Sequence, residues 1–136
     1  MTQPAASSAV LLDTHALVWA LGRPDLLSAT ARSVIESTAT TLFVSAASAW
    51  EIATKHRVGK FPEADGLVLG YEHHIARLGA TELAVTTRHA LTAGALSWPH
   101  RDPFDRMLAA QSMLESLPLV TADAAFRDCA GVRVVW

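Results

Sequence analysis

Short hydrophobic runs alternate with longer segments of helical periodicity along almost the whole chain. The runs, which favour buried strands, occur at 10–12, 41–44, 82–85, 117–120 and 132–135. Helical spacing is found around 17–21, after Ser28 to about 37, and over 46–57, 64–78, 86–94 and 103–115, with a short helix beginning at Asp123. No Asn-Gly or Asp-Gly hairpin turn joins two strands, which indicates an α/β fold. We therefore predict a three-layer α/β/α sandwich around a mostly parallel central sheet.

Several residues mark where the predicted helices begin and end. Ser45 is suited to cap the helix that follows it, and Pro103 fits the first position of its own helix. Gly59 lies just past a periodic segment and predicts the end of that helix. Gly66 and Gly70 lie inside the segment 64–78 and weaken the prediction of a continuous helix there.

Composition indicates one folded domain with a sizeable core. The chain has 136 residues, of which 51% are hydrophobic and 18% are charged, so disorder is not expected. The formal charge of −2 lacks the positive excess that is typical of many nucleic-acid-binding proteins. Cys129 is the only cysteine, which excludes an internal disulfide and a thiolate metal cluster and is compatible with a reducing cytoplasm.

The hydropathy of the chain bears on its location. No hydrophobic run approaches the length that crosses a bilayer, and the N-terminal segment lacks the basic residue of a signal peptide. We expect residues 1–8, with Pro4 among small side chains, to form a flexible arm, and residues 9–136 to form a single domain. These features predict a cytoplasmic protein without a membrane partner.

Four acidic residues fall where an α/β fold gathers its ligands. Asp13 and Asp123 directly follow hydrophobic strands, and Asp105 lies in the first turn of a predicted helix. In a right-handed βαβ sheet such junctions share one edge, at the carboxyl ends of the strands. Glu51 lies about one and a half turns into a helix that starts at this edge, so its side chain can reach the same place.

A cluster of four carboxylates would either take up protons or bind cations. Two unit charges about 4 Å apart interact by roughly 4 kcal/mol at an effective dielectric constant of about 20. Ligands that are all oxygen suit Mg²⁺ or Mn²⁺ better than zinc or copper. One or two such ions can activate water and neutralise a leaving oxygen, so the pattern permits phosphodiester hydrolysis.

Each acid also has an ordinary structural explanation. Asp13 and Asp123 are good helix caps, and the helix dipole favours Asp105 in a first turn. Glu51 precedes Lys55 by one helical turn, which would suit an exposed ion pair. Periodicity does not decide between these explanations and a shared metal site, so both stay open at this point.

Basic, histidine and aromatic residues leave similar alternatives. Lys55 is a candidate RNA contact or a cation favoured at a helix C-terminus, and Arg101 and Arg106 are candidates for RNA contact or for pairing with acids. The six histidines lack the H-x-x-x-H and H-E-x-x-H spacings, so a histidine metal site is not expected. Three large aromatic residues, with base stacking as the alternative role, are expected in the core: Trp19, Trp50 and Trp98.

Four sequence motifs resemble those of PIN-domain ribonucleases. They are LLDTHALVW at 11–19, VSAASAWEIATK at 44–55 with Gly59-Lys60 after it, HRDPFDRMLAAQ at 100–111, and LVTAD at 119–123. Their order and spacing extend over nearly the whole chain, from about 9 to 136. Within that family, the chain is most similar to the VapC toxins of bacterial toxin–antitoxin pairs.

The resemblance implies a single PIN domain over 9–136 and a role for each matching residue. Asp13, Glu51, Asp105 and Asp123 would be the catalytic acids and the metal ligands. Glu51 would serve either as a ligand or as the base that orients the attacking water. Thr121 would lie behind the ligands and fix a carboxylate through its hydroxyl group.

The resemblance also implies an activity and partners. The protein would hydrolyse RNA internally with Mg²⁺ or Mn²⁺, as the toxin of a toxin–antitoxin pair in the bacterial cytoplasm. It would form a homodimer, be inhibited by a cognate antitoxin protein, and reach promoter DNA only through that antitoxin. Two alternatives stay open: a non-catalytic PIN-fold binding module, and a small metal-dependent DNA nuclease.

Overall fold

A five-stranded parallel sheet forms the centre of the computed structural model, which describes residues 8–136. Its strands lie in the order β3-β2-β1-β4-β5. They are β1 (Ser8–Leu12), β2 (Thr40–Ser45), β3 (Thr81–Leu83), β4 (Leu119–Val120) and β5 (Val134–Val135). Each neighbouring pair runs parallel, so the sheet predicted as mostly parallel is parallel throughout these residues.

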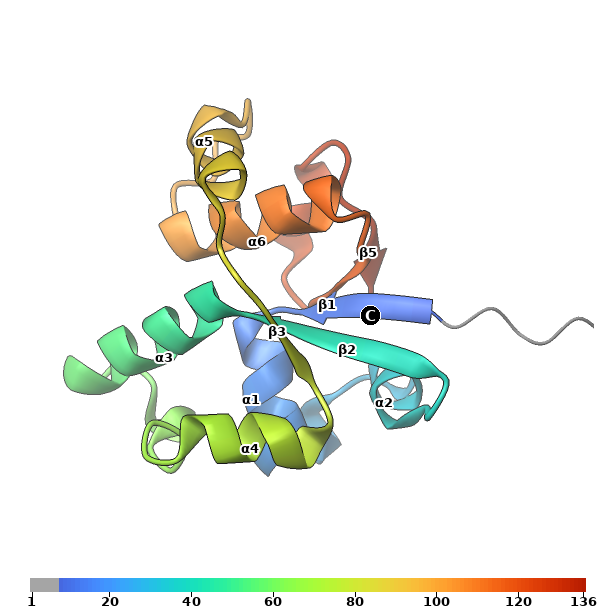
Figure 1. Cartoon of the computed structure of the whole chain (residues 1–136), viewed down its shortest axis with the longest axis vertical. Helices are drawn as coiled ribbons and strands as arrows, with labels where there is room; N and C mark the ends of the chain where they lie inside the picture. The colour runs from blue at the N-terminus through green and yellow to red at the C-terminus, as the bar shows by residue number, and fades with distance from the viewer. Residues whose placement is uncertain (1–7) are drawn as a thin grey trace, which may run out of the picture.

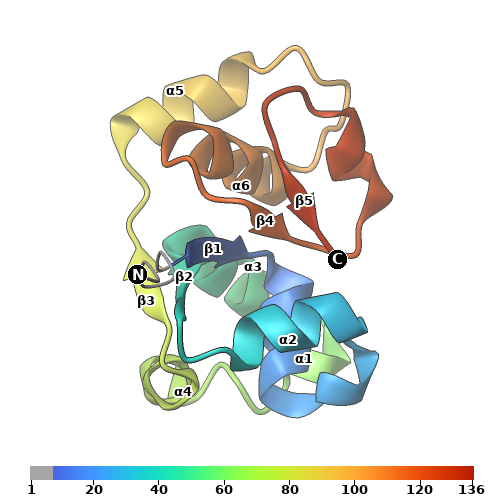
Figure 2. The same cartoon turned by 90° about the vertical axis from the view of Figure 1, so that its right-hand side faces the viewer.

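Helices cover both faces of the sheet, and the predicted three-layer sandwich is confirmed. On one side lie α5 (Thr87–Ala95) and α6 (Pro103–Leu114) (Figure 1). On the other side lie α1 (Thr14–Gly22), α2 (Ala29–Glu36) and α4 (Tyr71–Leu78) (Figure 2). The remaining α-helix, α3 (Ala46–Arg57), follows β2 directly and contacts both α1 and α6. Three short 3-10 turns complete the described chain: η1 (Pro24–Leu26), η2 (Pro62–Ala64) and η3 (Ala124–Asp128).

Two hydrophobic clusters fill the space between the layers, because successive strand residues face opposite sides of a sheet. Val10 and Leu12 of β1 belong to the cluster that includes residues of α1, α2 and α4. Leu11 of the same strand belongs to the cluster that includes residues of α6. Burial on both faces explains why this strand appears in the sequence as an unbroken hydrophobic run.

Side-chain caps fix the start of α3, whose bounds match the prediction. The Ser45 hydroxyl accepts a hydrogen bond from the Ala47 N–H at 3.0 Å. Gly59 follows the helix with a φ of 72°, in the left-handed conformation that commonly ends helices. This helix matters for the site because it carries Glu51 from the end of β2 toward α6.

The segment 64–78 differs most from its prediction. Helix α4 begins only at Tyr71, after η2 and after Gly70, which has a φ of 72°. A residue in this left-handed conformation does not continue an α-helix, so the hydrophobic spacing before it does not extend the helix. The predicted strands differ by at most two residues at their ends, and the turn that follows Asp123 is a 3-10 helix.

The first strand begins two residues earlier than predicted. Ser8 was assigned to the arm, but it starts β1, and its hydroxyl lies 3.3 Å from that of Thr40 in β2. The rest of the predicted arm, residues 1–7, lies outside the described residues. Within residues 8–136, no helix combines the length and the hydrophobicity needed to cross a membrane.

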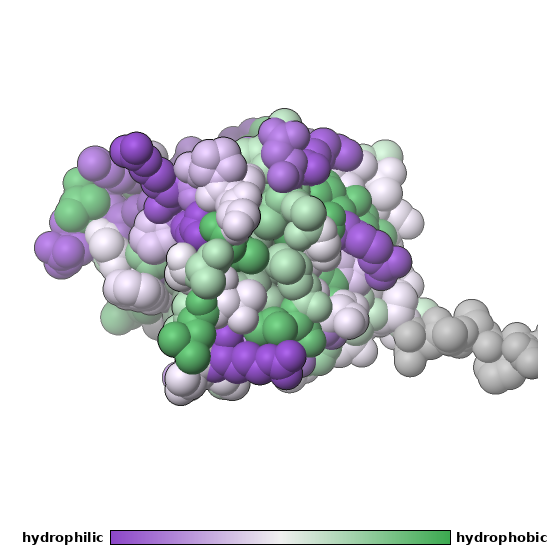
Figure 3. All heavy atoms as spheres, turned by 90° about the horizontal axis from the view of Figure 1, so that it is seen from above, coloured by the Kyte–Doolittle hydropathy of each residue, from purple (hydrophilic) through white to green (hydrophobic). Residues whose placement is uncertain are grey.

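The expectation that all three tryptophans lie in the core is wrong for Trp50. Trp50 is 63% exposed, whereas Trp98 is 6% exposed. Leu91 of α5 is also exposed, and on the face that carries α5 hydrophobic and hydrophilic residues are mixed (Figure 3). Trp50 packs edge-on against Phe104 with ring centroids 4.8 Å apart, at a surface where α3 meets α6.

Candidate metal centre

The sheet order places the ends of β1 and β4 side by side. From β1 the chain proceeds to β2 and β3 on one side, and it later returns to β4 and β5 on the other. Open α/β sheets bind ligands at such a reversal, beyond the carboxyl ends of the strands. The Asp13 N–H donates to the Val120 carbonyl at 3.0 Å, so Asp13 lies at this point.

Asp13 is buried and held by both of its oxygens. Oδ1 accepts from the Ala16 N–H at 2.8 Å and caps α1, while Oδ2 accepts from the Thr121 hydroxyl at 2.5 Å. Burial raises the pKa of Asp13 to about 6, and the negative charges of Glu51 and Asp123 add to the rise. The two hydrogen bonds oppose it. Asp13 is therefore a helix cap and a member of an acidic cluster at once.

Asp105 lies in the first turn of α6, next to the residue that caps this helix. Asp102 accepts from the N–H groups of Phe104 and Asp105 at 2.8 and 3.1 Å. The Asp105 carboxylate in turn is hydrogen-bonded to the His100 ring, with 2.7 Å between Oδ2 and Nε2. Burial raises the pKa of Asp105 to about 6, the charges of Asp102 and Glu51 add to the rise, and His100 opposes it.

Glu51 is buried inside the site and is not half of an exposed pair. Its side chain is 4% exposed, and its Oε2 accepts from the Lys55 ammonium, one turn further along α3. Its Oε1 is buried and has no hydrogen-bond partner within the described residues. Buried carboxylate oxygens are normally satisfied, so this atom indicates a missing partner.

Asp123 is exposed and lies three residues beyond the end of β4, before η3. Its Oδ1 accepts from the Ala125 N–H at 2.9 Å and caps η3. Its own N–H donates to the Thr121 hydroxyl at 3.0 Å, and that hydroxyl in turn donates to Asp13. Thr121 thus connects the two acids at the ends of β1 and β4.

All four predicted acids line one open cavity of about 410 Å³. Lys55 and Asp102 line it as well. The acids come from the segments after β1 and β4, from α3 and from α6. The prediction that the strand–helix junctions bring these acids together is therefore confirmed. The capping explanation also holds for Asp13 and Asp123, because each cap uses one oxygen of its carboxylate.

The donor set of this cavity fits a hard divalent cation. Five carboxylates line it, two of them with a pKa raised to about 6, and the Lys55 ammonium compensates part of their charge. The unpartnered Glu51 oxygen offers a free ligand. Mg²⁺ and Mn²⁺ prefer oxygen donors of this kind, so the residues present fit either ion.

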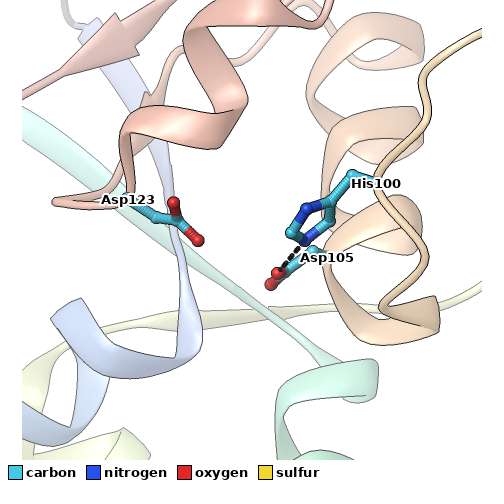
Figure 4. Close-up of side chains that lie close together, drawn as sticks. All are labelled: His100, Asp105 and Asp123. Carbon is cyan, nitrogen blue, oxygen red and sulfur yellow. Dashed lines mark hydrogen bonds and ion pairs between the residues drawn. The ribbon is translucent and has the colours of Figure 1, made fainter.

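Two residues at the site were not among the predicted ligands. Asp102, which caps α6, also lines the cavity. His100 was set aside because histidine spacing showed no metal motif, yet a nitrogen of its ring lies within 4.8 Å of oxygens of Asp105 and Asp123 (Figure 4). Both residues belong to the HRDPFDR segment. Their closeness to Asp105 in the sequence was the only feature that could have indicated their place at the site.

Arg106 was a candidate for RNA contact or for pairing with acids, and the structure gives it a different role. Its guanidinium group donates to five backbone carbonyl oxygens, those of Ala93, Gly94, Leu96, Trp98 and His100. The group therefore holds the loop between α5 and α6 and has no donor left for a phosphate in this arrangement.

A sequence profile of the PIN domain matches residues 10–132. The chain belongs to the PIN domain family. The matched range contains all four predicted acids, and the observed sheet and helices are those expected of a PIN-like fold. A search of curated protein sequences found no match.

Solved structures with the same fold include components of toxin–antitoxin complexes. A chain of VapBC2 from Rickettsia felis, bound to a DNA fragment from the promoter, has a TM-score of 0.66 and 14% identity, over 93% of this chain and 96% of that one. A chain of a toxin–antitoxin complex from Klebsiella pneumoniae has a TM-score of 0.62 and 18% identity, over 90% and 94%. Because both identities are below 20%, the similarity shows that this chain and these two chains share a fold.

Proposed function

We propose that this PIN domain is a VapC-type toxin, an endoribonuclease that depends on Mg²⁺ or Mn²⁺. The observation that carries the proposal is the gathering of four carboxylates around one cavity, at the sheet edge of a PIN domain. Asp13, Asp105 and Asp123 are the main metal ligands in this proposal. Glu51 is either a further ligand, through its unpartnered oxygen, or the base that orients the attacking water.

The chain's own contacts would keep these acids in place for catalysis. A bound cation would activate a water molecule and neutralise the charge that develops on the leaving oxygen of the phosphodiester. The N-terminus of α1 and Thr121 hold Asp13, and His100 holds Asp105. Contacts of this kind behind a ligand fix its orientation and strengthen metal binding.

The charge of the cavity determines how RNA could approach. Without a cation, the acids would repel a phosphodiester, and the whole chain has a formal charge of −2. We propose that the cation and two nearby basic side chains, Lys55 and Arg101, reverse the local sign. Lys55 already lines the cavity, and Arg101 is exposed between His100 and Asp102.

The solved neighbours suggest partners for this chain. Both belong to toxin–antitoxin complexes, and one of these is bound to promoter DNA. We accordingly propose a cognate antitoxin, a toxin homodimer, contact with promoter DNA only through the antitoxin, and a site of action in the bacterial cytoplasm. Light scattering of the chain alone would give two chains per particle, and co-purification with the adjacent gene product would test the antitoxin.

A cleavage assay tests the activity. Purified chain, free of any partner, is incubated with total cellular RNA and with single-stranded DNA of matched sequence, in Mg²⁺, in Mn²⁺ and in EDTA. Asp13→Asn removes a ligand charge but keeps a good helix cap. Asp25→Asn is the matched control, because Asp25 is exposed in η1 and pairs with Arg23.

The proposal predicts discrete RNA fragments that need the metal, persist in Asp25→Asn and disappear in Asp13→Asn. Expression of Asp13→Asn would also no longer be toxic to cells, although the variant stays folded. Equal cleavage of DNA would favour the DNA nuclease. Binding of RNA without cleavage under every metal condition would favour the non-catalytic module.

A further inference from the structure

His100 occupies a position that a carboxylate site does not require. One of its ring nitrogens and one oxygen each of Asp105 and Asp123 lie within 4.8 Å of one another. In Figure 4 the ring and the Asp105 carboxylate face each other, and Asp123 approaches from the opposite side, at the start of η3. Glu51 lines the same cavity as Asp105 and Asp123, and its oxygen without a partner among the described residues is an independent indication that this cavity holds a ligand.

The separations suit one shared ion. Two ligands about 2.1 Å from an octahedral ion lie about 3.0 Å apart when adjacent and about 4.2 Å apart when opposite. The His100 and Asp105 atoms are 2.7 Å apart, close to the spacing of adjacent ligands. Asp123 is the exposed member and its oxygen lies within 4.8 Å of both other atoms, so rotation of its side chain can bring it closer to them.

The ring of His100 is held in place by its surroundings. It stacks on Trp98 with ring centroids 4.6 Å apart and an interplanar angle of 21°. Trp98 is buried and packs on Phe126. The carbonyls of both Trp98 and His100 accept hydrogen bonds from Arg106, which fixes the path of the loop. A nitrogen donor fixed in this way loses little conformational entropy when it binds an ion.

We propose that His100 is a nitrogen ligand of this metal centre, and that the centre therefore prefers a first-row transition-metal ion such as Mn²⁺ to Mg²⁺. The inference rests on the proposed metal-dependent function. The protein ligands of Mg²⁺ are oxygens, whereas imidazole is a common ligand of transition-metal ions. In this arrangement the hydrogen bond between His100 and Asp105 is exchanged for a shared ion.

The alternative role for His100 is to orient Asp105 by donating a hydrogen bond to it. Two substitutions separate these roles. His100→Gln can still donate to Asp105 through its amide but lacks the imidazole nitrogen, and His100→Phe keeps the ring on Trp98 without any nitrogen. His15 lines the cavity and packs against Phe61 in a tilted arrangement with ring centroids 4.9 Å apart, so His15→Gln is the matched control.

The test is pulsed electron paramagnetic resonance of Mn²⁺ bound to the full chain, without a histidine tag, together with calorimetric titration by Mn²⁺ and by Mg²⁺. A directly bonded ¹⁴N nucleus gives a characteristic coupling to Mn²⁺. We expect this coupling in the parent and in His15→Gln, and its loss in both His100 variants. We also expect Mn²⁺ affinity to fall by about tenfold or more in these variants, and Mg²⁺ affinity to fall less.

Other outcomes overturn the inference in distinguishable ways. Bound Mn²⁺ without a nitrogen coupling in the parent would leave an all-oxygen site and keep the proposed function. Loss of the coupling in His15→Gln would assign the nitrogen to His15. If neither ion binds, both this inference and the metal-dependent function fail. Thermal unfolding of each variant establishes that it is folded, and absence of the coupling from the parent spectrum overturns the inference without any variant.

Discussion

At the scale of single residues, Asp13 and Asp105 are the acids of the cavity whose pKa is clearly raised. Each is largely removed from water and lies near other carboxylates, and each has a pKa raised to about 6 from 3.8. The ionised forms are therefore costly in the metal-free protein. Their hydrogen bonds, from Thr121 and Ala16 to Asp13 and from His100 to Asp105, reduce this cost without removing it.

Asp105→Asn should stabilise the metal-free protein at neutral pH. Between about pH 4 and 6 the folded state keeps a proton on Asp105 that the unfolded state releases, so the free energy of unfolding falls as the pH rises. A shift of about 2 pKa units corresponds to at most about 3 kcal/mol, and we expect about 1–2 kcal/mol because the side chain is partly exposed. Urea unfolding in EDTA from pH 4 to 7 measures the difference, which should vanish near pH 4. A variant less stable than the parent at pH 7 would contradict this account.

Thr121→Val should weaken metal binding while leaving the sheet intact. The substitution keeps the shape of the side chain but removes the hydroxyl that donates to Asp13 and accepts from the Asp123 N–H. Loss of such a contact behind a ligand typically costs about 10–100-fold in metal affinity. Mn²⁺ titration calorimetry tests this, and Thr121→Ser, which retains the hydroxyl, should restore most of the affinity. An unchanged affinity in Thr121→Val would mean that the hydroxyl does not position the acids.

At the scale of elements, the loop between α5 and α6 is organised by Arg106. Its guanidinium group joins the last turn of α5 to the loop that precedes α6, through backbone carbonyls alone. The loop also presents His100 to Asp105. A residue that we predicted to face RNA or acids thus acts on the site indirectly, by fixing the backbone.

Arg106→Lys should destabilise the protein, although it keeps the positive charge. A lysine cannot reach carbonyls spread over 93–100, and a carbonyl that is shielded from water and left without a partner costs about 1–3 kcal/mol. Four of the five hydrogen bonds are partly buried. We expect a loss of about 3 kcal/mol or more in urea unfolding. Arg101→Lys is the matched control, because Arg101 is exposed in the same motif. Equal effects of the two substitutions would contradict the role assigned to Arg106.

The elements also show how far sequence patterns reach. The strand–helix junctions predicted the meeting of Asp13, Glu51, Asp105 and Asp123, because parallel strands bring their carboxyl ends to one edge. The bounds of α3 followed from its cap and its terminal glycine. The segment 64–78 was predicted too long, since periodicity does not reveal the left-handed backbone at Gly70. His100 was missed because its position depends on a loop path set by tertiary contacts, which leave no periodic signal.

At the scale of the whole molecule, metal binding and folding are coupled through the acidic cavity. Any ion that binds only the folded state raises the free energy of unfolding, by about 2.7 kcal/mol at a concentration a hundredfold above its dissociation constant. The same ion must displace protons from Asp13 and Asp105 below about pH 6. Metal and proton therefore compete for one site.

Saturating Mn²⁺ should raise the melting temperature by about 10 °C at pH 7.5, on a scale of about 4 °C per kcal/mol for a domain of this size. At pH 5 the rise should be much smaller, because both acids are then largely protonated. Differential scanning calorimetry of the parent and of Asp13→Asn measures this, with EDTA reversing the effect. An equal rise at both pH values, or a full rise in Asp13→Asn, would place the binding ion elsewhere.

The most direct test of the central claim, that these carboxylates hold a divalent cation, is a crystal structure with Mn²⁺ and anomalous diffraction data. We predict an anomalous peak in the cavity at about 2.1–2.2 Å from oxygens of Asp105 and Asp123. We also expect carboxylate oxygens of Asp13 and Glu51 to contact the ion, directly or through bound water. A fully occupied Mn²⁺ peak at another place on the surface, with this cavity filled only by water, would contradict the account.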